Sequence, residues 1–254
     1  MAFELGDILG DRGRQALRDE RMAQYERDAA LFLRTEFAPA TRLLSDQDLA
    51  RVVQLAYRNA LARGIAGTRN HLKYLVPVMF WGSRFEADPQ YVTELQHARW
   101  LDSHGQPTGV ENLDTVIARI AGREHILRSD GLSGARIIEG FQRLYRGPEP
   151  ATTSYDLITA AMRAIWPQRD FLMTPPQRDA FINLNLAHAG RLQLFGRDAV
   201  AYICLAMYLG SGFHEDPRFP WVADALTTEG LSPEARRIAL GDAVLTYWDS
   251  LNES

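Results

Sequence analysis

Cysteine, lysine and long apolar runs are all scarce in this sequence. Cys204 is the only cysteine among 254 residues, which excludes an intramolecular disulfide. It lies in the apolar run Tyr-Ile-Cys-Leu-Ala, so we expect a buried and unreactive side chain. The richest apolar run, 199–209, is far shorter than the roughly 20 residues that span a bilayer. The sequence therefore predicts a protein without a membrane span.

The N-terminal residues lack the basic and apolar regions of a signal peptide, so a cytoplasmic location is expected. Lys73 is the only lysine, and arginine accounts for the other 27 of the 28 basic residues. Arginine suits forked contacts to carboxylates at protein interfaces, although codon use in a GC-rich genome explains the bias more simply. The net charge is −4 and the pI is about 5.9, which argues against a nucleic-acid-binding surface.

Apolar residues recur with helical spacing along almost the whole chain, and no segment alternates as a strand does. A first helix is predicted over 14–37 and ended by Pro39, with an apolar side formed by Leu17, Met22, Tyr25, Ala29, Phe32, Leu33 and Phe37. Ser45 can cap a second helix, whose apolar positions run from Leu49 to Leu61. Thr68 can cap a third, over 69–81. It is apolar nearly all round and so belongs at the centre of a fold.

The decisive feature is an internal repeat. Residues 79–91, MFWGSRFEADPQY, align with 207–219, MYLGSGFHEDPRF, at an offset of 128, and six of the 13 positions are identical. The match extends backwards, because the helix after Ser45 corresponds to one over 175–192 that begins with the capping box Thr174 to Gln177. Asp198 is the expected cap of the second central helix.

The repeat predicts an all-α fold in which two tandem-duplicated helical units pack into one globular body. Each unit closes with a helix after a Leu-Ser pair, at 132–133 and 231–232. The first unit spans 1–146, with the N-terminal helix and a polar insertion at 102–114, and the second spans 155–254. Residues 147–154, rich in proline, threonine and serine, form the predicted linker.

The repeated pattern Gly-Ser-x-Phe-x-x-Asp-Pro is typical of a fold-defining turn. Its glycine can end the central helix, its phenylalanine can plug the turn, and its aspartate can cap a following helix that starts with proline. We favour this architectural role over a chemical one because it explains every fixed residue. The structural motif residues are Gly82, Phe85, Asp88, Pro89, Gly210, Phe213, Asp216, Pro217 and Trp221.

No catalytic residue, metal or cofactor is assigned from the sequence. His214-Glu215-Asp216 could bind a metal or transfer protons, but the first copy has Glu86 in place of the histidine. No second histidine follows at ligand spacing. Gly210-Ser211-Gly212 lacks the Gly-x-Ser-x-Gly spacing of a hydrolase elbow and follows a predicted helix instead of a strand. No phosphate-binding Gly-rich loop with Gly-Lys-Ser/Thr occurs in the sequence.

The order of helices and the segment 209–221, LGSGFHEDPRFPW, resemble a family of small uncharacterised helical proteins. These proteins are encoded beside type VI secretion effector, spike and adaptor genes of proteobacteria. The first unit departs from the pattern, because Trp81 replaces the leucine and Val92-Thr93 replaces the proline-tryptophan pair. The resemblance implies a tandem version of this family and a genomic setting, but no reaction.

Three functions are compatible with the sequence. The leading hypothesis is a non-catalytic protein-binding accessory of a secretion effector module, either an effector chaperone or co-adaptor, or an immunity protein. The alternatives are an enzyme with an unrecognised site at the repeated turns and a structural scaffold. The expected partner is a secreted effector or its adaptor, bound by surface that the two units do not share. The candidate partner-binding residues are Arg14, Arg18, Arg21, His104, His214 and Arg218.

Overall fold

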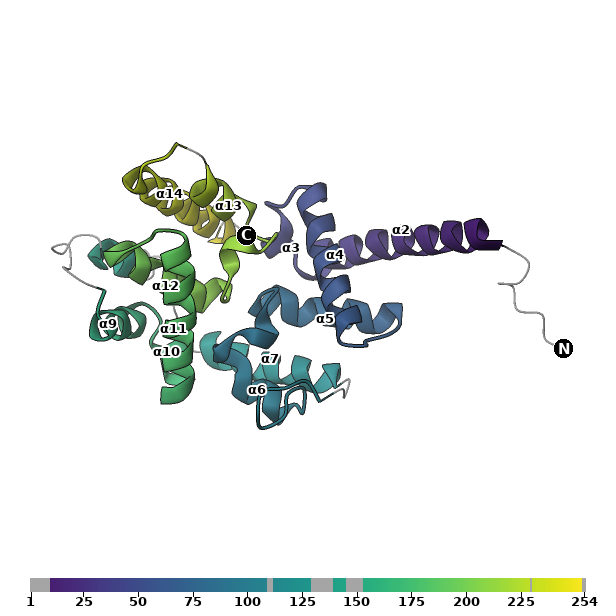
Figure 1. Cartoon of the computed structure of the whole chain (residues 1–254), viewed down its shortest axis with the longest axis horizontal. Coiled ribbons are helices and arrows are strands. Elements are labelled where there is room, and N and C mark those ends of the chain that lie inside the picture. The colour runs from purple at the N-terminus through teal and green to yellow at the C-terminus, as the bar shows by residue number, and fades with distance from the viewer. Residues whose placement is uncertain (1–9, 109–111, 129–138, 145–152, 229, 253–254) are drawn as a thin grey trace.

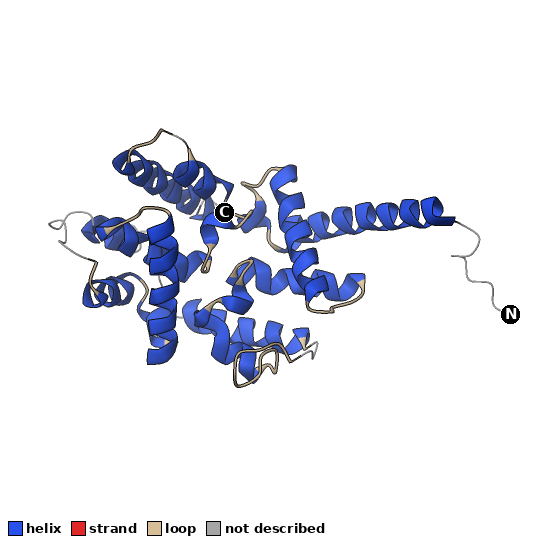
Figure 2. Ribbon diagram, viewed as in Figure 1, coloured by secondary structure: helices blue, strands red, loops and turns tan. Residues whose placement is uncertain are grey.

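The computed structural model describes residues 10–108, 112–128, 139–144, 153–228 and 230–252, and these residues form helices joined by turns (Figure 2). No strand occurs among them, although an isolated bridge pairs Leu101 with Pro107. The predicted all-α class is confirmed. Within the same residues, no helix combines the length and the apolar character needed to cross a membrane.

The N-terminal half begins with the long helix α2 (Gly10–Glu36), which projects from the rest of the molecule (Figure 1). Next come α3 (Ala38–Thr41), α4 (Asp46–Ala62) and α5 (Thr68–Trp81). The short helices η1 (Phe85–Ala87), η2 (Pro89–Tyr91) and α6 (Val92–His97) follow, and α7 (Leu113–Arg128) packs against α5. A first hydrophobic core gathers around α5, with fully buried Leu75, Trp81 and Phe85.

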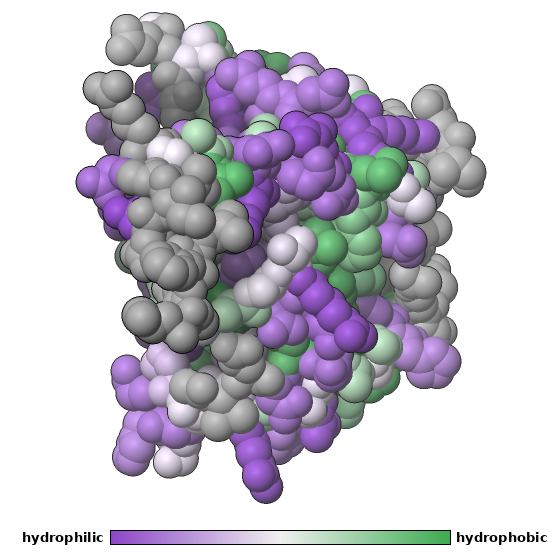
Figure 3. All heavy atoms as spheres, turned by 90° about the vertical axis from the view of Figure 1, so that its right-hand side faces the viewer, coloured by the Kyte–Doolittle hydropathy of each residue, from purple (hydrophilic) through white to green (hydrophobic). Residues whose placement is uncertain are grey.

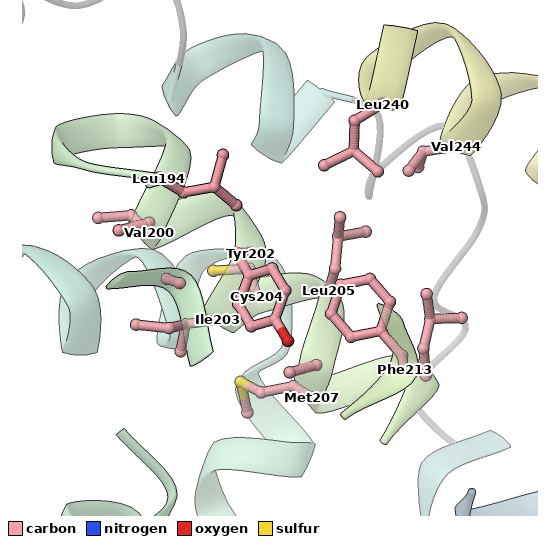
Figure 4. Close-up of a cluster of buried hydrophobic side chains, with 14 of the residues drawn as sticks. Leu194, Val200, Tyr202, Ile203, Cys204, Leu205, Met207, Phe213, Leu240 and Val244 are labelled. Atoms are coloured by element: carbon pink, nitrogen blue, oxygen red, sulfur yellow. The ribbon is translucent and has the colours of Figure 1, made fainter. Parts of the chain in front are cut away.

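The C-terminal half contains α9 (Tyr155–Ile165), α10 (Pro167–Phe171), α11 (Pro175–Arg191), α12 (Gly196–Leu209), η3 (Phe213–Glu215), α13 (Pro220–Thr227) and α14 (Pro233–Asn252). Ten residues of α12 are buried, and this helix forms the centre of a second core (Figure 4). Cys204 is completely buried there, as predicted, and burial raises the pKa of its thiol to about 12.

The two halves share one order of elements around their central helices. The helices α4 and α11 each have 17 residues, and α5 and α12 each have 14. Thr68–Trp81 and Gly196–Leu209 differ in numbering by 128, which is the offset of the sequence repeat. Each central helix is followed by a short turn of 3-10 helix, η1 or η3.

Some helix ends agree with the sequence and some do not. Ser45 caps α4 by accepting a hydrogen bond from the Asp48 N–H at 3.1 Å, as predicted, and the capping box at Thr174 starts α11. The predicted caps Thr68 and Asp198 are wrong. Thr68 is already helical, because Gly67 turns the chain at φ 84°, and α12 starts at Gly196, before Asp198.

The apolar side of α2 is only partly used. Tyr25, Ala29 and Leu33 are buried in the first core, as predicted, whereas Leu17 is 37% exposed. Leu17 is exposed because this end of α2 extends beyond the residues it would pack against (Figure 1). Leu61, in the last turn of α4, is also exposed.

The predicted boundary between units falls mostly outside the described residues, as do Leu132 and Ser133. Ser154, the last residue of the predicted linker 147–154, caps α9 through the Leu157 N–H. Phe141 and Leu144 pack against the second core, although the predicted boundary assigns them to the first unit. At the other Leu-Ser pair, the Ser232 hydroxyl accepts a hydrogen bond from the Ala235 N–H at the start of α14.

Candidate functional site

The two copies of the repeated turn lie against each other where the central helices end. We call the residues 82–91 and 210–219 together the motif joint. Gly82 and Gly210 end α5 and α12 with φ angles of 104° and 93°, which favour glycine. A Cβ on Gly210 would stand 2.6 Å from the Trp81 carbonyl oxygen, so only glycine lets the two backbones approach this closely.

The two aspartates of the motif exchange hydrogen bonds across the joint. Oδ2 of Asp88 accepts from the Ser211 N–H at 2.6 Å, and Oδ2 of Asp216 accepts from the Ser83 N–H at 2.9 Å. The other oxygen of each carboxylate accepts from the backbone two residues further on, at Gln90 or Arg218. Asp88 therefore caps the helix η2 that starts with Pro89, as predicted, whereas Asp216 holds a turn, because the next helix begins only at Pro220. Each aspartate also binds the other copy.

The joint is similar in backbone geometry but unequal in charge. Arg218 donates to Asp216 at 2.9–3.1 Å and to the carbonyl oxygens of Met79 and Leu209. Gln90 stands in the corresponding place and donates to the Ala206 carbonyl at 3.2 Å. The joint thus contains two buried carboxylates and one buried guanidinium.

The pKa values of the two aspartates shift in opposite directions for this reason. Burial raises the pKa of Asp88, and its hydrogen bonds from Ser211 and Gln90 offset only part of that rise. Burial acts on Asp216 in the same sense, but the Arg218 charge and its hydrogen bonds outweigh burial and lower the pKa.

The remaining motif residues complete this joint. Phe85 and Phe213 are buried below the turns, as predicted. Pro89 begins η2, and its carbonyl oxygen accepts a hydrogen bond from Gln177 of α11. Trp221, in the first turn of α13, packs partly buried against the second core. The repeated residues therefore hold the two halves of the chain together.

Arg218 and His214 are not available to a partner, so their prediction as partner-binding residues is wrong. The side chain of Arg218 is 6% exposed, because its guanidinium is enclosed by the joint. The His214 side chain is 9% exposed. Its Nδ1 lies 2.6 Å from the Tyr202 hydroxyl, and its ring packs edge-on against His188.

His188 of α11 packs against His214. The sequence did not indicate this contact, because the two histidines belong to separate elements. The two ring centroids are 5.2 Å apart. Burial lowers the pKa of His214 to about 4 and also lowers the pKa of His188, so both rings are neutral at pH 7. No group of three metal-ligating side chains that could hold an ion occurs among the described residues.

The first motif copy has an ion-paired network at the same place. Glu86 corresponds to His214, and it accepts from Arg63 at 2.6 Å and from the Trp100 indole at 3.0 Å. The two copies therefore hold different polar side chains at equivalent positions of the joint.

The three arginines predicted to bind a partner from the first helix are exposed. Arg14, Arg18 and Arg21 belong to the projecting part of α2, where every residue from 14 to 21 is exposed. His104 is also exposed, in a loop held by the Asp102 carboxylate, which accepts from the backbone N–H groups of His104 and Gln106.

A shallow apolar groove of about 370 Å³ lies between α5 and α7. Phe80 and Ile117 are among its lining residues, and Glu124 and His125 are its polar ones. The sequence did not indicate this groove, because it depends on how two helices pack.

In comparisons with known proteins, the chain matches no protein family, no curated protein and no solved structure.

Proposed function

We propose that this protein is a non-catalytic accessory that binds another protein, and that α2 is its docking element. The observation that carries the proposal is the projection of α2 from the body (Figure 1). Residues 10–21 extend it by about 18 Å of helix, and residues 14–21 are exposed on every side.

A helix of this kind gains little from the rest of the molecule. Isolated helices of about 12 residues are marginal in water, because most helical stability comes from packing of an apolar face. Here the support is local, from side-chain pairs such as Arg14 with Asp11 at 2.8 Å and Gln15 with Asp19 at 2.8 Å. A partner that packs on this segment would supply the missing contacts.

The motif joint also supports the proposal, because it stabilises the body from which α2 projects. Its residues hold the two halves together through buried hydrogen bonds, so the body can serve as a rigid base for α2. The two halves are proposed to be a tandem duplication, supported by the shared offset and the equal lengths of the central helices. Residues 40–100 should superpose on 172–226 as equivalent helical units. Different orders of helices in these two segments would contradict the duplication.

The resemblance to proteins encoded beside type VI secretion genes suggests the class of partner. We propose a secreted effector or its adaptor, bound before delivery by a chaperone or co-adaptor, or masked by an immunity protein. Loss of delivery with self-protection intact on deletion of the gene would favour the chaperone. Self-intoxication would favour the immunity protein.

The direct test is co-purification of the full chain with the products of the adjacent genes. A matched variant lacking residues 1–21 removes the projecting part and leaves Tyr25 and the first core in place. We expect the parent to retain a partner that this variant loses, with both proteins melting at similar temperatures. Equal recovery of the partner by both proteins would contradict docking through α2.

A further inference from the structure

The projecting part of α2 is not uniform around its axis. Arg14, Arg18 and Arg21 follow one another at spacings of four and three residues, which places them on one side of the helix. Continuing the same spacing leads to Tyr25 and Ala29, which are buried against the body. One stripe of α2 is therefore apolar where it meets the body and basic where it leaves it.

The point at which the stripe leaves the body is well defined. The Tyr25 ring packs against Tyr57 of α4 and His71 of α5, with centroids 5.2 and 5.8 Å apart. One turn further towards the N-terminus, Arg21 is exposed. A molecule lying along the arginine stripe would thus continue the contact that α4 makes with α2.

Much of the charge on this stripe is uncompensated. Arg14 pairs with Asp11 at 2.8 Å, whereas Arg18 and Arg21 form no ion pair with any residue in the described parts of the chain. The acidic Asp19 and Glu20 stand on other sides of the helix. Viewed from the side on which α2 projects, the surface is largely hydrophilic, with a smaller apolar area (Figure 3).

We infer that the arginine stripe binds an acidic segment of a partner protein, with aspartate or glutamate carboxylates seated on Arg14, Arg18 and Arg21. This inference rests on the proposed function and names the chemistry of the partner. Arginine forks pair two hydrogen bonds with one carboxylate, and arginine is enriched among residues that dominate protein interfaces. The net charge of −4 on the whole chain weakens long-range attraction of polyanions, so recognition depends on local pairing along the stripe.

The binding test uses the full chain and defined probes. The first probe is a helical peptide of about 20 residues with glutamate at every third or fourth position. The second probe is the same peptide with glutamine at those positions. The variant carries Arg14→Glu, Arg18→Glu and Arg21→Glu. The control carries Arg27→Glu, because Arg27 is exposed on the opposite side of α2 and donates to Gln24 of the same helix at 2.7 Å.

We expect the parent and the control to bind the glutamate peptide, and the triple variant to bind at least about tenfold more weakly, with a smaller dependence on salt. The glutamine peptide should not bind. Equal weakening by the control, or no binding of the glutamate peptide by the parent, would overturn the inference. So would stripe-dependent binding of phosphatidylserine vesicles or single-stranded DNA in place of the peptide.

A cross-linking experiment locates the contact. Because Lys73 is the only lysine and its amine is held by Asp114 at 2.6 and 2.8 Å, Arg18→Lys adds the one exposed lysine on α2. A carbodiimide should couple this amine to a glutamate of the peptide, and Arg27→Lys should give no such product. Coupling from position 27 alone would place the peptide on the wrong side.

These outcomes separate the inference from the proposed function. If an adjacent-gene product needs α2 but tolerates the three charge reversals, α2 docking stands and the acidic partner is wrong. If that product binds equally well without α2 while the glutamate peptide binds the stripe, the stripe does recognise acidic segments, and the proposal that the adjacent-gene product docks on α2 is wrong.

Discussion

The two motif copies place their aspartates alike but differ in backbone before and after them and in electrostatics. Arg84 has φ −111° where Gly212 has φ 77°, and only the first copy forms a 3-10 helix after its Asp-Pro pair. Asp88 and Asp216 adopt the same torsion angles within 2°, at φ −83° and −84° and ψ 118° and 120°. Yet one carboxylate lies beside the neutral Gln90 and the other beside the charged Arg218. The comparison teaches that a buried carboxylate can hold this turn by accepting backbone N–H groups without a cation beside it. We expect the copy with the added charge to be more sensitive to substitution.

The largest difference is expected between the two aspartates. Asp216→Ala leaves Arg218 buried without its carboxylate and should lower the free energy of unfolding by about 4 kcal/mol. Asp88→Ala leaves two N–H groups without an acceptor and should cost about 2 kcal/mol. Urea unfolding of both variants measures the ranking, and Gln90→Arg in the Asp88→Ala background should widen the loss. A larger loss for Asp88→Ala would show that Arg218 is not held mainly by Asp216.

The glycines give the next contrast. Gly210→Ala combines a left-handed φ with a Cβ 2.6 Å from a carbonyl oxygen, so it should cost about 3 kcal/mol. Gly82→Ala should cost less, because its nearest contact, the end of the Arg218 side chain, is 3.3 Å away.

Gly64→Ala is the matched control for the glycine series. Gly64 also has a positive φ, 74°, but no atom lies within 4 Å of its Cβ position. Its loss of about 1 kcal/mol therefore measures the backbone strain by itself. Thermal melts in which all three variants shift equally would remove the argument for close approach at the joint.

His214, which Glu86 replaces in the first copy, predicts a loss of stability in mild acid. The pKa of His214 in the folded protein is about 4, below the ordinary value of 6.5. Its neutral form therefore contributes stability above pH 6.5 that is lost as the pH falls from 6.5 towards 4, by no more than about 2 kcal/mol after solvent screening.

Asp88 acts in the opposite sense, because its raised pKa means that protonation relieves the cost of burying its charge as the pH falls. The difference between parent and His214→Gln, measured by urea unfolding at pH 7 and pH 5, isolates the histidine. An unchanged difference between the two pH values would contradict burial of a neutral His214. Asp88→Asn, measured in the same way, should lack the gain in stability that protonation of Asp88 gives as the pH falls.

The smallest effect is expected for the ion pair that joins the copies at the surface. Arg84 and Glu215 are each about half exposed, so Arg84→Ala or Glu215→Ala should change the free energy of unfolding by less than about 1 kcal/mol. The effect should disappear in 1 M salt, where charges are screened within a few ångström. A loss as large as that of Asp88→Ala would show that this surface ion pair contributes as much to the stability of the joint as the buried carboxylate does.

Much of the secondary structure could be read from local patterns. Ser45, Thr174 and Gly82 act on the residues beside them, so their roles as helix ends follow from a few neighbouring positions. Thr68 failed as a cap because Gly67 can adopt a left-handed φ and so starts the helix earlier. The exposed Leu17 shows a second limit, since spacing indicates a helix face but not whether anything packs on it.

The candidate site was less predictable. The position of Arg14, Arg18 and Arg21 in the first helix predicts exposed side chains, and the structure leaves them exposed. The two copies differ at Arg218 and His214, which predicts surface particular to one unit, yet both side chains are largely enclosed. Nothing in the local sequence of His214 indicates that His188 lies against it, because α11 and η3 are separate elements.

The sequence by itself determined that this protein is helical, and that a glycine ends each central helix shortly before an Asp-Pro pair. These features depend on contacts within a few residues, where spacing and residue type are sufficient. The tertiary structure alone decided that the second oxygen of each aspartate binds the other copy, as Ser83 and Asp216 do across 133 residues of chain. It also decided that Arg218 is enclosed and that Arg18 is free, because burial depends on which elements meet and spacing along one helix does not specify its neighbours.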